Sequence, residues 1–152
     1  MTTVLIAVDD SDDAVETACA AHKFFGDDAA YFVINVGRLG LPGMMWGTPY
    51  PVMGAALMYP QMWAQTADAT QSVEETAAIR AEVVAHEAAV PDATTLGDAG
   101  DPARAILRAG REHRADVVVV GSHERGWFSR LFAGSVSDHV VKESEIPVLV
   151  VK

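Results

Sequence analysis

Cysteine and basic residues are both scarce in this chain of 152 residues. The single cysteine, Cys19, cannot form an intramolecular disulfide, and its place in an apolar helical stretch predicts a small core residue in a protein of a reducing compartment. Lys and Arg number 11 against 21 Asp and Glu, and the formal net charge of −10 repels nucleic-acid phosphates and anionic lipid surfaces. We therefore expect no nucleic-acid partner, and any phosphate site must depend on local geometry.

The sequence also lacks an export signal and a continuous apolar span. The apolar run near the N-terminus, residues 4–8, is too short for a secretory signal and has no basic segment before it. Residues 39–67 carry no charge, but prolines and glycines recur throughout them, which argues against a membrane helix. We expect a cytoplasmic protein with no membrane span.

Short apolar strands alternate with helical segments along the chain. Buried strands are predicted over residues 4–8, 31–36, 117–120 and 146–151, and a weaker strand over residues 93–96. Helices are predicted after Ser11, over residues 66–89, after Asp101-Pro102 and over residues 135–144. This alternation predicts a single α/β domain over residues 1–152, a Rossmann-like fold with a five-stranded, mostly parallel sheet and helices on both faces.

Two details of this prediction concern the middle of the chain. Residues 37–70 are rich in Met, Pro, Gly and Trp, which predicts an irregular apolar loop segment. The apolar residues of the helix after it approximate one inner face, made of Val73, Ala77, Ile79, Val83 and Val84.

The most informative stretch is VVVVGSHERGWFSRLFAGSV, residues 117–136. A buried strand ends at Gly121, a polar loop follows, and Gly134-Ser135 opens the next helix. Backbone N–H groups of Gly134, Ser135 and Val136, at the positive end of the helix dipole, are able to hold a phosphate without a basic side chain. An ordinary helix cap by Ser135 is the alternative interpretation.

Several better-known sites are excluded by residue type. Gly121 and Gly126 have the spacing of a Walker A motif, but Trp127 and Phe128 stand where Lys and Ser or Thr are required. No G-x-G-x-x-G follows the first strand, so a dinucleotide fingerprint is absent too. Neither His123 nor His139 has a second ligand at zinc-like spacing, and we expect no metal site and no catalytic residue.

The motifs and their order resemble the universal stress protein family. Its signature is Gly, two residues, Gly, nine residues and then Gly-Ser or Gly-Thr around a bound ATP, and Gly121 and Gly134-Ser135 match its first and last elements. The stretches VLIAVDDSDDA, GDPARAIL and IPVLVVK resemble the family's first strand with its aspartate, its Gly-Asp-Pro helix start and its closing strand. Residues 37–70 have no clear counterpart.

The resemblance implies a site for ATP or AMP, with or without Mg²⁺. Carried over by position, it puts Ala7 and Asp9 near adenine and ribose, where Asp9 accepts a ribose hydroxyl proton, and Val36 against the adenine. From the residues alone, Asp9 is equally a candidate cap of the first helix, in competition with Asp10 and Ser11. The implied cofactor-binding residues are Ala7, Asp9, Val36, Val120, Gly121, His123, Glu124, Gly134, Ser135 and Val136.

Glu124 departs from the family pattern, which has glycine at that position. Its Cβ disfavours a positive φ, and its carboxylate repels phosphates by on the order of 1 kcal/mol, although Arg125 and Arg130 could compensate. Two functions stay open: an adenine-nucleotide-binding stress-response or signalling protein with at most slow ATP hydrolysis, and a nucleotide-free dimeric regulatory module. An adenylate-forming enzyme is disfavoured, because residues 8–11 are not a Ser-Gly-Gly phosphate loop.

The final apolar strand predicts self-association. Residues 146–151 form an apolar strand with no charge before Lys152, which would be a pairing hazard at the edge of a sheet. The family resemblance implies antiparallel pairing with a second copy. We expect a homodimer through residues 146–151, and a regulatory protein partner that the sequence does not identify.

Overall fold

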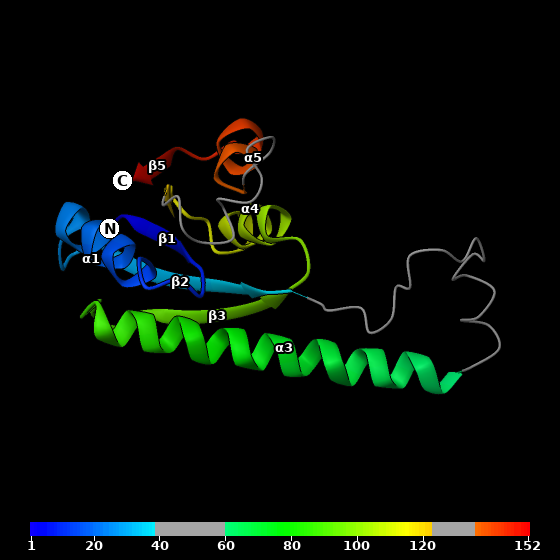
Figure 1. The fold of residues 1–152 in the computed structure, drawn as a ribbon. Helices are drawn as coiled ribbons and strands as arrows, with labels where there is room; N and C mark the ends of the chain where they lie inside the picture. The colour runs from blue at the N-terminus through cyan, green and yellow to red at the C-terminus, as the bar shows by residue number, and fades with distance from the viewer. Residues whose placement is uncertain (39–59, 123–135) are drawn as a thin grey trace.

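The computed structural model describes residues 1–38, 60–122 and 136–152, and these contain one five-stranded sheet (Figure 1). Its strands are β1 (Thr3–Val8), β2 (Ala30–Gly37), β3 (Thr94–Ala99), β4 (Val117–Gly121) and β5 (Val148–Val151), in the order β3-β2-β1-β4-β5. All four neighbouring pairs are parallel. The predicted five-stranded α/β fold is confirmed.

Helices cover both faces of the sheet (Figure 1). The helices α1 (Ala14–Phe25) and α3 (Pro60–Glu87) pack on one face, and α4 (Pro102–Glu112) and α5 (Val136–Glu143) pack on the other. The central strands β1 and β4 lie between the two layers, which explains why they consist almost wholly of buried Val, Leu, Ile and Ala. Among the described residues, no helix combines the length and apolarity that a bilayer crossing requires.

The helix α3 corrects the prediction for residues 37–70. It begins at Pro60, so residues 60–70 are helical, not irregular; proline fits a first turn, where its missing N–H would have no helical partner. Residues 39–59 of that segment lie outside the described part of the chain. In Figure 1, the N-terminal part of α3 extends past the carboxyl ends of β2 and β3.

The inner face of α3 is made of smaller residues than predicted. Ile79 and Val83 are exposed, at 61% and 40%, and the buried residues among the described side chains of this helix are Ala77, Ala81, Val84 and Ala85. The reason is a very close approach to the sheet: a Cβ built on Gly97 of β3 would lie 2.0 Å from the carbonyl oxygen of Glu74. Large aliphatic side chains do not fit between backbones so close together.

The start of α4 follows the prediction closely. Asp101 is the N-cap, and its Oδ1 accepts a hydrogen bond from the backbone N–H of Arg104 at 2.9 Å, with Pro102 as the next residue. The predicted inward residues Ala103, Ile106 and Leu107 are all buried.

Cys19 is exposed, and its predicted place in the core is wrong. The buried residues of α1 are Ala14, Thr17, Ala18 and Ala21. One residue corresponds to about 100° around a helix, so the position after Ala18 turns away from the sheet.

Candidate functional site

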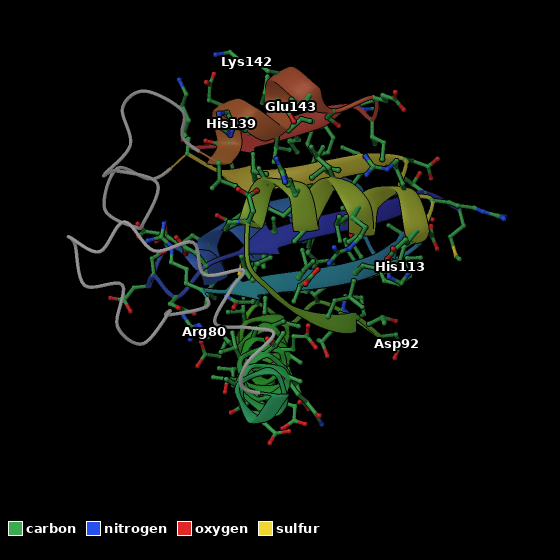
Figure 2. The ribbon with its side chains drawn as sticks, turned by 90° about the vertical axis from the view of Figure 1, so that its right-hand side faces the viewer. Arg80, Asp92, His113, His139, Lys142 and Glu143 are labelled. Atoms are coloured by element: carbon green, nitrogen blue, oxygen red, sulfur yellow. The ribbon has the colours of Figure 1, made fainter. Side chains whose placement is uncertain are left out.

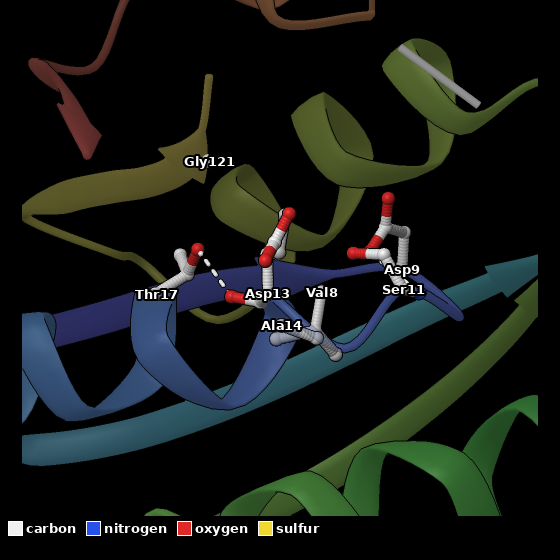
Figure 3. A pocket seen from close by; sticks show the side chains of 8 residues that line it. Val8, Asp9, Ser11, Asp13, Ala14, Thr17 and Gly121 are labelled. Carbon is white, nitrogen blue, oxygen red and sulfur yellow. Dashed lines mark hydrogen bonds between the residues drawn. The ribbon is translucent and has the colours of Figure 1, made fainter. Parts of the chain in front are cut away.

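A hollow lies where the strand order of the sheet reverses. From β1 the chain proceeds to β2 and β3 on one side, whereas β4 and β5 lie on the other, and open parallel sheets bind ligands at the carboxyl ends of strands at such a point. Figure 3 shows the hollow, about 240 Å³ with its open side included. Its lining residues are Ala7, Val8, Asp9, Ser11, Asp13, Ala14, Thr17 and Gly121.

Asp9 is the buried polar residue of this hollow, with 7% of its surface exposed. Its Oδ1 accepts hydrogen bonds from the backbone N–H of Ser11 at 3.0 Å and from the Ser11 hydroxyl at 2.5 Å. No described residue donates to its Oδ2, so that oxygen can still accept from a ligand. The N-cap of α1 is Asp13, so the alternative that Asp9, Asp10 or Ser11 caps this helix is wrong.

Two residues that the sequence reasoning missed hold the loop after β1. Asn35 of β2 is 3% exposed, and its Nδ2 donates to the carbonyl oxygen of Val8 at 3.2 Å and to Oδ1 of Asp10 at 3.3 Å. Arg80 of α3 donates from Nη2 to the carbonyl oxygen of Ser11 at 3.0 Å. Both carry a sequence signal, because a buried amide in an apolar strand and an arginine on the inner side of a helix need polar partners.

The polar groups in the described wall of the hollow are carboxylates and hydroxyls, beside the apolar Ala7, Val8 and Ala14. Asp9 and Asp13 supply carboxylates, and Ser11 and Thr17 supply hydroxyls; the Thr17 hydroxyl donates to the carbonyl oxygen of Asp13 at 3.2 Å (Figure 3). No Lys or Arg side chain lines it among the described residues. Such a wall can accept hydrogen bonds from ligand hydroxyls but attracts no phosphate. No group of three His, Cys, Asp or Glu side chains suited to a metal ion occurs in the described ranges.

The structure brings together part of the predicted site. Ala7, Asp9 and Gly121 line the hollow. Val120 is fully buried beside Ala7, its register partner, and does not line it. Val36 lies on β2 against the core under α4, and Val136 is the buried first residue of α5; neither lines the hollow. The other four predicted residues lie outside the described part of the chain: His123, Glu124, Gly134 and Ser135.

The sheet order, with a hollow at the point where it reverses, defines an open, doubly wound α/β domain, and sequence comparison identifies the family within this fold class. Residues 49–152 match the sequence model of the universal stress protein family. The chain belongs to this family.

Curated relatives support this assignment, and solved structures share the fold. A universal stress protein from Thermus aquaticus is 40% identical over 80 residues, which are 53% of this chain and 58% of that protein. The matched segments span 30% to 58% of the curated relatives, so they cover under two thirds of those proteins. A universal stress protein in complex with cAMP has a similar fold, with a TM-score of 0.60 and 22% identity over 99% of this chain and 95% of that one. An Arabidopsis thaliana family member with AMP bound gives a TM-score of 0.55 at 19% identity, over 100% of this chain and 92% of that one.

Proposed function

We propose that this chain is an adenine-nucleotide-binding universal stress protein, in which the hollow between β1 and β4 holds the adenosine part of AMP or ATP. The observation that carries the proposal is the buried Asp9 at the reversal point, with Oδ2 left for a ribose hydroxyl. The small residues Ala7 and Gly121 line the hollow beside it. Similar folds that hold cAMP and AMP support the same class of ligand.

The place of the ligand's phosphates is inferred from the sequence. We propose that the phosphates, with Mg²⁺ where ATP is bound, meet the loop that ends at Gly134-Ser135 and the start of α5 at Val136. The acidic wall around Asp9 and Asp13 supports this division, because carboxylates repel phosphates.

The direct test is whether the purified protein carries or binds adenine nucleotide. Chromatography of the denatured protein identifies carried nucleotide, and titration calorimetry measures AMP and ATP affinity. We expect Asp9→Asn to weaken AMP binding by roughly tenfold, because a hydrogen bond to a charged acceptor is lost. Asp12→Asn is the matched control, since Asp12 is exposed in the same loop and carries the same charge. Equal effects of both substitutions would contradict a specific role for Asp9.

We propose that chemistry in this site is slow or absent, so that the protein acts through what it binds. The support comes from the sequence, which has Trp127 and Phe128 in place of the Lys and Ser or Thr of a Walker A motif. A steady-state ATP turnover near or above ~1 s⁻¹, ordinary for an enzyme, would overturn this part.

The alternative is a nucleotide-free dimeric regulatory module on the same fold, which Glu124 in the predicted phosphate loop favours. Protein that neither carries nor binds AMP or ATP would select this alternative. In both cases we propose a homodimer through β5, an edge strand of the sheet, and action in the cytoplasm on a regulatory protein partner. The cytoplasm is supported by Cys19, which has no second cysteine for an intramolecular disulfide.

A further inference from the structure

Arg80 occupies an unexpected place for a charged residue. It stands on the inner side of α3 between Ala77, Ala81 and Val84, all of which are buried, and Figure 2 shows it on the side of that helix toward the sheet. Its Nε is buried and has no hydrogen-bond partner among the described residues. Because a buried donor without a partner is unfavourable, packing alone does not explain an arginine here.

The contact that Arg80 does make is with the wall of the hollow. Its Nη2 donates to the carbonyl oxygen of Ser11 at 3.0 Å, a contact between residues 69 positions apart. The same oxygen accepts the backbone N–H of Ala14 at 3.3 Å, in the turn that leads into α1. Ser11 in turn donates twice to Oδ1 of Asp9. The Arg80 guanidinium therefore holds Ser11, which links Asp9 to the start of α1.

The charge of Arg80 suits this position. The loop it contacts contains four aspartates within five residues: Asp9, Asp10, Asp12 and Asp13. Their carboxylates repel one another, so the loop gains from a fixed positive charge nearby. Arginine supplies that charge in a planar group that donates in a fixed direction.

We propose that Arg80 is a positioning residue for the hollow: it fixes the Ser11 carbonyl and so orients the Asp9 carboxylate, without lining the hollow itself. The consequence for ligand affinity rests on the proposed nucleotide-binding function. The consequence for the loop does not, because loop order is measurable in the ligand-free protein.

The test uses Arg80→Met, which keeps the length of the chain but neither charge nor donor, and Arg80→Lys, which restores both. Hydrogen exchange of the Ser11 and Ala14 amides is followed without ligand, and AMP affinity by calorimetry. We expect faster exchange at these two amides and roughly tenfold weaker AMP binding in Arg80→Met, with both largely restored in Arg80→Lys. If Arg80→Met does not fold, Arg80→Leu takes its place, because leucine also has neither charge nor donor.

Arg108→Met is the matched control, because Arg108 of α4 pairs with Asp98 of β3 and not with a residue of the loop. Melting temperatures of all variants report any general loss of stability. Unchanged exchange at Ser11 and Ala14 in Arg80→Met, or the same change in Arg108→Met, would overturn the proposal. If the wild type binds no AMP but the two amides still exchange faster in Arg80→Met, the positioning role is supported and the nucleotide function is contradicted.

Discussion

At the scale of single residues, the hollow is defined by polar groups that hold each other in place. Asp9 receives both of its hydrogen bonds from Ser11, and Asn35 bridges the end of β1 and Asp10 from the neighbouring strand. A carboxylate held in this way needs little reorganisation when a hydroxyl arrives, which lowers the entropic cost of binding.

Glu124 should weaken the binding of phosphates specifically. If its carboxylate repels them, Glu124→Gly tightens ATP binding by roughly tenfold, about 1.4 kcal/mol, and changes adenosine affinity little. Glu124→Ala removes the charge but keeps a β-carbon, so the two variants separate repulsion from backbone strain. Calorimetry with ATP and adenosine measures both; an equal gain for both ligands would contradict a phosphate effect.

Tyr31 should lower the stability of the folded protein at alkaline pH. Burial, and then the negative charge of Asp27, raise the pKa of its phenol above the ordinary value of 10.0, and the hydroxyl donates to the carbonyl oxygen of Gly26 at 2.6 Å. Because the folded pKa is the higher one, the unfolded chain loses the proton first, and stability falls as pH rises above about 10. Urea unfolding at about pH 8 and about pH 11 should show that the free energy of unfolding falls less between these two pH values in Tyr31→Phe than in wild type. An identical fall would rule out Tyr31 as its source.

At the scale of the elements, the strands and the start of α4 were predictable because their signals are local. Apolar runs end at glycine or acidic clusters, and Asp101-Pro102 is a cap followed by a first-turn proline. The face of α3 was not predictable, because the closeness of its packing depends on Gly37 and Gly97, which lie in other elements. Arg80 was missed for the same reason: its partner, Ser11, is distant in sequence.

The close packing of α3 on β3 predicts a large effect of one methyl group. In Gly97→Ala the new Cβ would lie 2.0 Å from the carbonyl oxygen of Glu74 and 2.5 Å from the backbone nitrogen of Ala78. Because backbone atoms must move, we expect a loss of about 2–3 kcal/mol in the free energy of unfolding. Urea denaturation measures it.

The control for this prediction is the same substitution inside α4. In Gly110→Ala the nearest atom is the flexible Cδ1 of Ile146 at 3.1 Å, and alanine is the better helix former, so we expect a change of less than about 1 kcal/mol. Equal losses in the two variants would contradict the close-packing explanation.

At the scale of the whole molecule, the edge strand β5 should determine the assembly. Wild type should sediment at about twice the chain mass of 16.2 kDa, and Val150→Lys should shift it toward the monomer, because Val150 is 38% exposed on this strand and lysine opposes edge pairing. Val141→Lys is the matched control, since Val141 is 49% exposed on α5. A wild-type monomer at tens of micromolar protein, or equal dissociation by both variants, would contradict the β5 interface.

The pairing of β1 with β4 also affects how the molecule folds. Thr3 donates to Oδ2 of Asp116, 113 positions away, and the hollow takes walls from both strands, so it exists only after this distant pairing has formed. Closing so long a loop is entropically costly, and contacts of this kind slow folding. A nucleotide that recognises the finished hollow has nothing to bind before β1 and β4 have paired. It would therefore lengthen the lifetime of the folded protein by slowing unfolding, and leave the rate of refolding unchanged.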